Sequence, residues 1–220
     1  MLLELKDVSK IFQLDGVEVK ALQNISFEVK RGEFLAIMGP SGSGKSTLMY
    51  LMGCLDSPTS GKISLEGKDI SGLSEQELAK IRNKKIGFVF QMFNLLPRTS
   101  ALANVELPLI YSGLTKKERE IKARQALSYL GLKERLTHFP SQLSGGEQQR
   151  VAIARALVTS PAMILADEPT GNVDSQSARE IMKIFKELNK EGNTIVVVTH
   201  DKQVAKYAKK IIKIHDGRIV

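Results

Sequence analysis

The sequence has little of what secreted or membrane-spanning proteins depend on. Among its 220 residues there is one cysteine, Cys54, which excludes an internal disulfide and a cysteine-only metal site. No apolar run approaches the ~18 residues that cross a membrane, and Met1 to Asp7 carries an acid early, unlike a signal peptide. We therefore expect a soluble, cytosolic protein in which Cys54 is a buried, inert thiol.

Aromatic residues are also scarce, at 5% of the chain, and tryptophan is absent. The net charge of +8 is spread over separate pairs, such as Lys84-Lys85, Lys116-Lys117 and Lys209-Lys210. Nucleic-acid-binding segments concentrate basic residues and interleave them with aromatic ones, and no such run occurs in this sequence. A solvated lysine-rich surface is the preferred interpretation, and no nucleic acid is expected as a partner.

What the chain does contain is a glycine-rich stretch that fits G-x-x-x-x-G-K-[ST]. An apolar run over 33–38 precedes it and predicts a buried strand, and residues 46–52 predict the start of a helix. Glycines let backbone N–H groups turn inward around an anion, and a helix N-terminus adds partial positive charge. The motif predicts a phosphate-binding loop (P-loop) formed by Gly39, Pro40, Ser41, Gly42, Ser43, Gly44, Lys45, Ser46 and Thr47. Lys45 would reach the outer phosphates, and Ser46 would bind Mg²⁺.

The remaining hydrophobic pattern predicts an α/β fold. Residues 3–8, 25–29 and 62–67 alternate apolar and polar side chains, so they predict half-exposed antiparallel strands, the first two joined through a turn around Asp15-Gly16. Continuous apolar runs over 86–90, 162–166 and 194–199 predict buried strands of a parallel sheet. The first of these runs is expected at the centre of that sheet.

Polar side chains follow each of the buried strands, where ligands collect in open α/β sheets. Gln91 follows the first strand, Asp167 and Glu168 the second, and His200 the third. Asp167 would hold Mg²⁺ through water, and Glu168 would polarise an attacking water as general base. The alternatives are a surface acid at Glu168 and a satisfied strand-end histidine at His200.

The middle third of the chain, residues 92–159, has no strand pattern and predicts an inserted helical subdomain. Ser144 and Glu147 form a capping box, so a helix begins there and runs to about Val158. Gly145 and Gly146 follow the cap directly and would let an anion approach the helix N-terminus closely. A poorly formed helix start is the alternative for this stretch.

Together these motifs resemble the ATP-binding cassette (ABC) ATPases over nearly the whole chain. The matching segments are the Walker A motif at 39–47, the Q-loop at Gln91, the signature at 143–148, Walker B at 163–167 before Glu168, the D-loop ending at Asp174, and the H-loop at His200. The resemblance implies one ABC ATPase domain over 1–220. Its mostly parallel core and an N-terminal antiparallel β subdomain would occupy about 1–91 and 160–220, and the helical subdomain about 92–159.

The resemblance also implies roles that the residues alone do not. Two copies would dimerise head to tail around two ATP molecules with Mg²⁺, and Ser144, Gly145, Gly146 and Glu147 of one copy would contact the nucleotide held by Lys45 of the other. Phe12 would stack on adenine. Gln91 would join Ser46 and Asp167 at Mg²⁺, and catalysis would involve Glu168, His200 and Lys45. Asp174 would lie at the dimer contact, and the apolar side chains that follow Gln91 would receive the membrane partner or form subdomain core: Met92, Phe93, Leu95 and Leu96.

Two departures from the family pattern stand out. Glu147 occupies a signature position where glutamine is commoner, although either residue completes a capping box. Residues 171–174 read Gly-Asn-Val-Asp, where a small residue followed by Ala-Leu-Asp is usual. The second departure puts the geometry of the cross-subunit contact in doubt.

Within the family, residues 86–91, 94–97 and 104–109 resemble the group that contains lipoprotein-releasing and macrolide-exporting ATPases (the LolD/MacB group). The macrolide exporters carry a fused membrane part, which this sequence lacks, so we expect a stand-alone ATP hydrolase of the lipoprotein-releasing (LolD-like) type. It would act as a translocase subunit on separately encoded permeases, peripheral to the cytoplasmic face of the inner membrane. The alternatives are an exporter of the same group and, more remotely, an ABC ATPase acting on nucleic acid. A P-loop kinase or GTPase would leave the signature and His200 unexplained.

Overall fold

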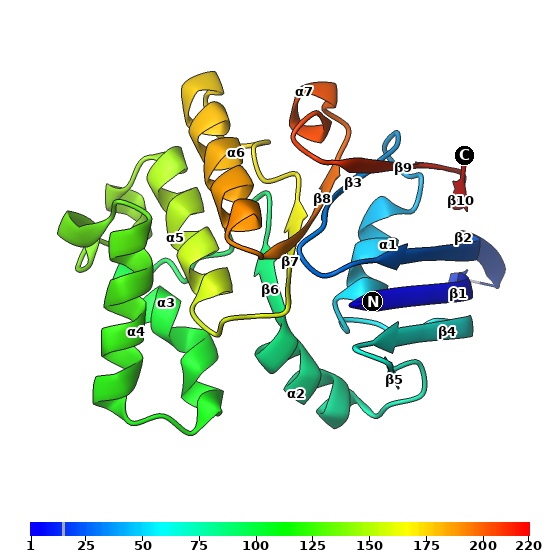
Figure 1. Cartoon of the computed structure of the whole chain (residues 1–220), viewed down its shortest axis with the longest axis horizontal. Helices are drawn as coiled ribbons and strands as arrows, with labels where there is room; N and C mark the ends of the chain where they lie inside the picture. The colour runs from blue at the N-terminus through cyan, green and yellow to red at the C-terminus, as the bar shows by residue number, and fades with distance from the viewer. Residues whose placement is uncertain (15) are drawn as a thin grey trace.

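The computed structural model describes residues 1–14 and 16–220, so Asp15 of the predicted turn lies outside the described residues. Figure 1 shows a sheet at the N-terminal end of the chain beside a larger central sheet, with a group of helices on the far side of the molecule. The chain enters the helical group after β6 and returns to the central sheet at β7. This arrangement confirms the expected α/β fold.

The first sheet is antiparallel, with strand order β2-β1-β4-β5. Its strands are β1 (Leu3–Leu14), β2 (Val17–Val29), β4 (Ser60–Leu65) and β5 (Lys68–Asp69). The alternating pattern predicted β1 and β2 but too short, because these strands stay paired as far as Leu14 and Val17. It placed β4 two residues late, at 62–67, and did not predict β5. Leu3 and Leu5 are buried with the period of two, and Val8 is buried three residues further on, after a register irregularity in the pairing with β2.

The central sheet has the order β10-β9-β3-β8-β7-β6. Every neighbouring pair is parallel except β10 with β9. Its strands are β3 (Phe34–Met38), β6 (Ile86–Val89), β7 (Met163–Asp167), β8 (Thr194–Thr199), β9 (Lys210–His215) and β10 (Arg218–Ile219). The carboxyl ends of β3, β7 and β8 therefore meet at one edge, where the candidate site lies.

The prediction of a central position for residues 86–90 was wrong, because β6 is the edge strand of this sheet. Its apolar run reflects helices packed on both of its faces rather than a central position in the strand order. A Cβ on Gly87 would lie 2.5 Å from the Ala156 carbonyl oxygen of α5, and Phe88 abuts Gly53 at the end of α1. A continuous apolar run shows that both faces are covered, which helices achieve here at an edge.

Helix α5 begins at the cap predicted at Ser144, and two further helices begin in the same way. Capping boxes are present at Ser74, Thr115 and Ser144, where each hydroxyl accepts from a backbone N–H three residues on. The helices are α1 (Lys45–Met52), α2 (Glu75–Lys85), α3 (Ala101–Glu106), α4 (Lys116–Tyr129), α5 (Gly145–Leu157), α6 (Ser175–Lys190) and α7 (Lys202–Ala205). Short 3₁₀ turns occur at η1 (Leu107–Ser112), η2 (Lys133–Arg135) and η3 (Pro140–Gln142).

Two hydrophobic clusters hold these layers together. One joins the N-terminal sheet and α1 to one face of the central sheet. The other joins the opposite face to α6 and to the helices between β6 and β7. In α6, Ile181, Phe185 and Leu188 are buried, each contributing about 1.5–3 kcal/mol of burial free energy. Within the described residues, no helix combines the length and apolar character needed to span a bilayer.

Candidate nucleotide-binding and hydrolysis site

The P-loop lies between β3 and α1, as its sequence context predicts. Gly42 and Gly44 have φ values of +78° and +99°, a backbone region that glycine enters without steric cost. Lys45 is only 8% exposed, and its Nζ donates to the Pro40 carbonyl oxygen over 2.7 Å. The lysine is thus folded back over its own loop, with its ammonium group where an anion would bind.

The P-loop opens into a cavity of about 880 Å³ that gathers the polar strand ends. Gln91, Asp167, Glu168 and His200 line this cavity together with the P-loop. The P-loop residues on its wall are Pro40, Ser41, Gly42, Gly44, Lys45, Ser46 and Thr47. Gly39 lines an adjacent smaller cavity, and Ser43 is buried. The structure therefore brings the P-loop together with the candidate Mg²⁺ and catalytic residues that follow β6, β7 and β8.

Glu168 is held by β8 at both carboxylate oxygens. Its Oε1 accepts from the His200 backbone N–H over 2.9 Å and lies 2.6 Å from His200 Nδ1, while Oε2 accepts from the Thr199 hydroxyl. Glu168 itself has φ +41°, a strained conformation for a side-chain-bearing residue. The side chain is 16% exposed and the His200 side chain 73% exposed. A carboxylate this well oriented suits a general base.

Asp167 is the candidate metal ligand from the end of β7. Its pKa is raised above the usual range, first by burial and second by the adjacent Glu168 charge, while Lys45 and Ser46 partly offset the rise. The cavity wall carries three acids, Asp167, Glu168 and Asp216, against two lysines, Lys20 and Lys45, so it is short of positive charge. Carboxylate, hydroxyl and amide oxygens are ligands that Mg²⁺ accepts, and Asp167, Ser46 and Gln91 present them to this cavity.

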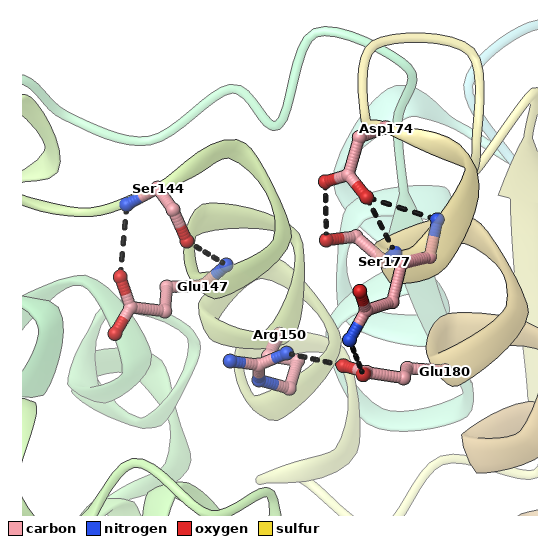
Figure 2. A network of polar contacts seen from close by, with 7 residues as sticks. Ser144, Glu147, Arg150, Asp174, Ser177 and Glu180 are labelled. Carbon is pink, nitrogen blue, oxygen red and sulfur yellow. Dashed lines mark hydrogen bonds and ion pairs between the residues drawn. The ribbon is translucent and has the colours of Figure 1, made fainter.

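The signature residues lie elsewhere. Among the described residues that line the cavity, none comes from 144–147. At the start of α5, the Ser144 hydroxyl accepts from the Glu147 N–H, and Glu147 Oε2 accepts from the Ser144 N–H (Figure 2). Arg135 donates to Glu147 Oε1, and this contact, followed by the Ser144 N–H, lowers the pKa of Glu147 to about 2. Glu147 therefore stays ionised and completes the cap, as expected.

The two signature glycines make room for neighbours in the same chain, Gly145 for the D-loop and Gly146 for α6. A Cβ on Gly146 would lie 2.6 Å from Ser177 Oγ, and one on Gly145 would lie 3.3 Å from the Asn172 carbonyl oxygen. Gly146 is buried. α6 therefore fills the space beside Gly146, and the approach of an anion to the start of α5 stays a prediction.

Asp174 is engaged within its own chain. It caps α6, where Oδ1 accepts from the Gln176 and Ser177 N–H groups and Oδ2 accepts from the Ser177 hydroxyl (Figure 2). The Ser177 hydroxyl contact is the main reason that the pKa of Asp174 is lowered. The unusual D-loop has partners too: Asn172 Nδ2 lies 2.9 Å from Met92 Sδ, and Gly171 leaves room for the Gln91 amide.

The apolar residues after Gln91 differ in exposure, and their contact with a membrane partner stays a prediction. Met92 is 71% exposed and Leu96 48% exposed, whereas Leu95 packs against the helical cluster. Phe93 is partly buried, and its carbonyl accepts from the guanidinium of the half-buried Arg155. Phe12 is 36% exposed on β1 and lies under Lys10 Nζ, 5.0 Å from its ring centroid. Phe12 does not line the cavity, although its strand partner Val19 does.

Sequence reasoning missed two contributors to this region. Gln149 of α5 is fully buried, and its Nε2 donates to the Pro169 carbonyl oxygen over 2.6 Å, which ties the signature helix to the loop after Glu168. The cavity is also walled by β2 and by the turn between β9 and β10. The Asp216-Gly217 turn is recognisable in the sequence, but its place beside the P-loop is not.

A P-loop lysine sharing a cavity with two acids at the end of a parallel strand defines a P-loop nucleotide triphosphatase. The family model described as ABC transporter matches residues 22–171, and the chain belongs to that family. It is an ATP-binding ABC ATPase whose ATP hydrolysis is coupled to transport.

Relatives of known sequence or structure agree with this assignment. An "uncharacterized ABC transporter ATP-binding protein" of Thermotoga maritima is 55% identical, covering 99% of this chain and 93% of the relative. The macrolide export ATP-binding/permease protein MacB of Hyphomonas neptunium is 51% identical over the whole chain, which spans 34% of that relative. The dimeric post-hydrolysis structure of the cassette MJ0796 bound to ADP and Pi superposes with a TM-score of 0.91 at 47% identity, covering 99% of this chain and 96% of the other.

Proposed function

We propose that two copies of this chain bind two ATP molecules head to tail and power a separate membrane permease. The observation that carries the proposal is the separation of the signature from the catalytic cavity. Lys45 and Glu168 share one cavity, whereas no described residue of the capped α5 N-terminus lines it. A second copy would bring its Ser144, Gly145, Gly146 and Glu147 to that cavity. The similar MJ0796 cassette is dimeric with ADP and Pi bound.

In this proposal the residues divide the work of hydrolysis. Lys45 binds the outer phosphates, and Ser46, Asp167 and Gln91 would hold Mg²⁺, which neutralises phosphate charge when bound. Glu168 accepts a proton from the attacking water, and its contacts with Thr199 and His200 fix the direction of its oxygens. A Phe12 ring that stacks on adenine would do so beside Val19.

A groove beside the edge strand β6 supports the proposal that a membrane permease docks on this chain. Its volume is about 690 Å³, and its floor includes Phe88 and Phe90, whose rings stack 5.5 Å apart. Its described lining contains four basic residues and no acid: Lys80, Arg82, Lys84 and Arg155. Arg155 holds the Asn94 and Phe93 carbonyls, which joins the groove to the segment after Gln91. An acidic amphipathic helix of a permease fits this lining.

Two cargoes are proposed for such a complex. The first is release of lipoproteins from the inner membrane towards the outer membrane. Its support is the resemblance to lipoprotein-releasing ATPases of residues 86–91, 94–97 and 104–109. The 51% identity to the macrolide exporter MacB supports macrolide export as the second candidate. In either case the chain would act from the cytoplasmic face of the inner membrane.

The two-copy proposal is tested by Glu168→Gln, which keeps the side-chain shape but removes the base. With Mg²⁺-ATP this variant should sediment as a dimer, because bound ATP bridges the copies and is not hydrolysed. With ADP it should remain a monomer. Adding Ser144→Arg to Glu168→Gln should abolish the dimer while ATP still binds. A Glu168→Gln chain that stays monomeric at saturating ATP contradicts the proposal.

The groove and cargo are tested by pull-down and by stimulated hydrolysis. Lys84→Glu should reduce the membrane proteins that copurify with the chain, whereas Lys186→Glu, at an exposed position outside the groove lining, should not. Equal losses in both variants contradict the groove assignment. Hydrolysis by the copurified complex should rise with lipoprotein if lipoprotein is the cargo. A rise with a macrolide alone replaces the first candidate by the second.

A further inference from the structure

We propose that the turn between β9 and β10 positions the P-loop, and that Gly217 is a positioning residue for nucleotide binding. The turn lies 170 residues beyond the P-loop in the chain, after the end of the family match at Gly171. The Gly217 N–H donates to the Ser43 carbonyl oxygen over 3.0 Å. Asp216 and Gly217 also form part of the cavity wall. One turn therefore both supports the phosphate-binding loop and faces its ligand space.

The turn is itself fixed to β2. The Gln23 N–H donates to the Gly217 carbonyl oxygen over 2.8 Å, and Gln23 Nε2 donates to the Asp216 carbonyl oxygen over 3.1 Å. Arg218 donates to Gln23 Oε1 over 2.9 Å. The hairpin thus connects an early strand of the first sheet to the P-loop through main-chain contacts that no side-chain motif records.

Three glycines allow these backbones to meet. A Cβ on Gly39 would lie 2.2 Å from the Ile214 carbonyl oxygen, and a Cβ on Gly44 would lie 2.4 Å from that of Ala21. A Cβ on Gly217 would lie 2.7 Å from the same Ala21 oxygen. Since real Cβ atoms do not approach backbone atoms so closely, the P-loop has no free space on this side. A shift of the hairpin must therefore shift the P-loop.

The contact with Ser43 also orients an N–H group that would donate a hydrogen bond to phosphate. A trans peptide points its C=O and the following N–H in opposite directions. The bond from Gly217 to the Ser43 carbonyl therefore also fixes the direction of the Gly44 N–H, one of the donors that a P-loop turns towards phosphate. Ser43 is only 2% exposed, and its Oγ has no hydrogen-bond partner within 1–14 and 16–220. Its position therefore depends on main-chain bonds: the Ser43 N–H donates to the Pro40 carbonyl oxygen over 3.3 Å within the loop, and the Gly217 bond is the contact from outside the loop.

The test compares Gly217→Ala with Gly67→Ala in the full chain. The β4–β5 turn is a matched control, because Glu66 and Gly67 have positive φ values (+52° and +80°), as do Asp216 and Gly217 (+45° and +72°). A Cβ on Gly67 meets nothing within 4 Å. Both variants carry similar backbone strain, but only Gly217→Ala clashes with β2, at Ala21 and Leu22. To relieve that clash the turn must shift, which disturbs its bond to the Ser43 carbonyl oxygen.

ADP binding by calorimetry is the readout, because ADP excludes hydrolysis. Gly217→Ala should raise the ADP dissociation constant about fivefold, the effect of losing one backbone hydrogen bond, and Gly67→Ala should leave it unchanged. If Gly217→Ala does not fold, Arg218→Ala loosens the turn without entering the cavity and should raise the constant about twofold. The proposal is overturned if the ADP dissociation constant is unchanged in Gly217→Ala or, where that variant does not fold, in Arg218→Ala. An equal rise in Gly67→Ala also overturns it.

Discussion

Asp167 and Glu168 are neighbours in sequence that the fold holds in different ways. Glu168 has a partner at each oxygen, from Thr199 and from His200. Asp167 is pressed into the cavity, where burial and the Glu168 charge raise its pKa. The position of Asp167 lowers the stability of the folded chain, because an acid with a raised pKa destabilises the folded state when it is ionised.

Asp167→Asn should therefore stabilise the Mg²⁺-free protein at pH 7, by roughly 0.5–1 kcal/mol, while abolishing hydrolysis. The folded-state pKa lies above the ordinary 3.8, so the penalty is present at neutral pH and fades as the pH falls towards 3.8. The gain in unfolding free energy, measured by urea titration, should fade with it. The exposed Glu134→Gln should show no such gain. A destabilised Asp167→Asn at pH 7 would refute this account.

At the scale of elements, α5 and α6 act as a pair. Figure 2 shows their capped N-termini side by side, with Arg150 of α5 facing Glu180 of α6 at 3.5 Å. Gly146 packs directly on Ser177. The signature helix α5 is therefore positioned by α6, the helix that follows the D-loop of the same chain. The signature and the D-loop should then move together when a second copy binds.

Gly146→Ala should lower ATP hydrolysis about tenfold or more, because the new Cβ pushes α5 away from Ser177 and displaces Ser144. ADP binding to the P-loop should not change. Adding Ser177→Gly removes the clash, so the double variant should recover part of the lost rate in a steady-state assay. No recovery would show that α6 packing is not why glycine is needed at 146.

The sequence predicted the residues of the site better than the strand order and backbone contacts that hold those residues in place. Motif residues at strand ends, Lys45, Asp167 and Glu168, met in one cavity because parallel strands end at one sheet edge. The position of β6 was mispredicted, since an apolar run reports covered faces and not strand order. The reason for Gly146 and the place of Gly217 depend on backbone contacts across long sequence separations, which no local pattern encodes.

At the scale of the whole molecule, the P-loop cavity and the signature lie in different regions of the chain. The Lys45 cavity lies at the carboxyl edge of the central sheet, and the signature lies at the start of α5. The charge-bearing β6 groove is a third surface, linked to the signature helix through Arg155. A pair of chains would complete two ATP sites and present two grooves to a permease.

Mixing two defective chains tests the composite site most directly. Lys45→Ala lacks the P-loop cation and Ser144→Arg blocks the signature, so each should be nearly inactive alone in a phosphate-release assay. In a mixed dimer, the intact P-loop of one chain meets the intact signature of the other. The account predicts that the mixture hydrolyses ATP well above the sum of the separate rates. A mixture no faster than that sum would contradict it.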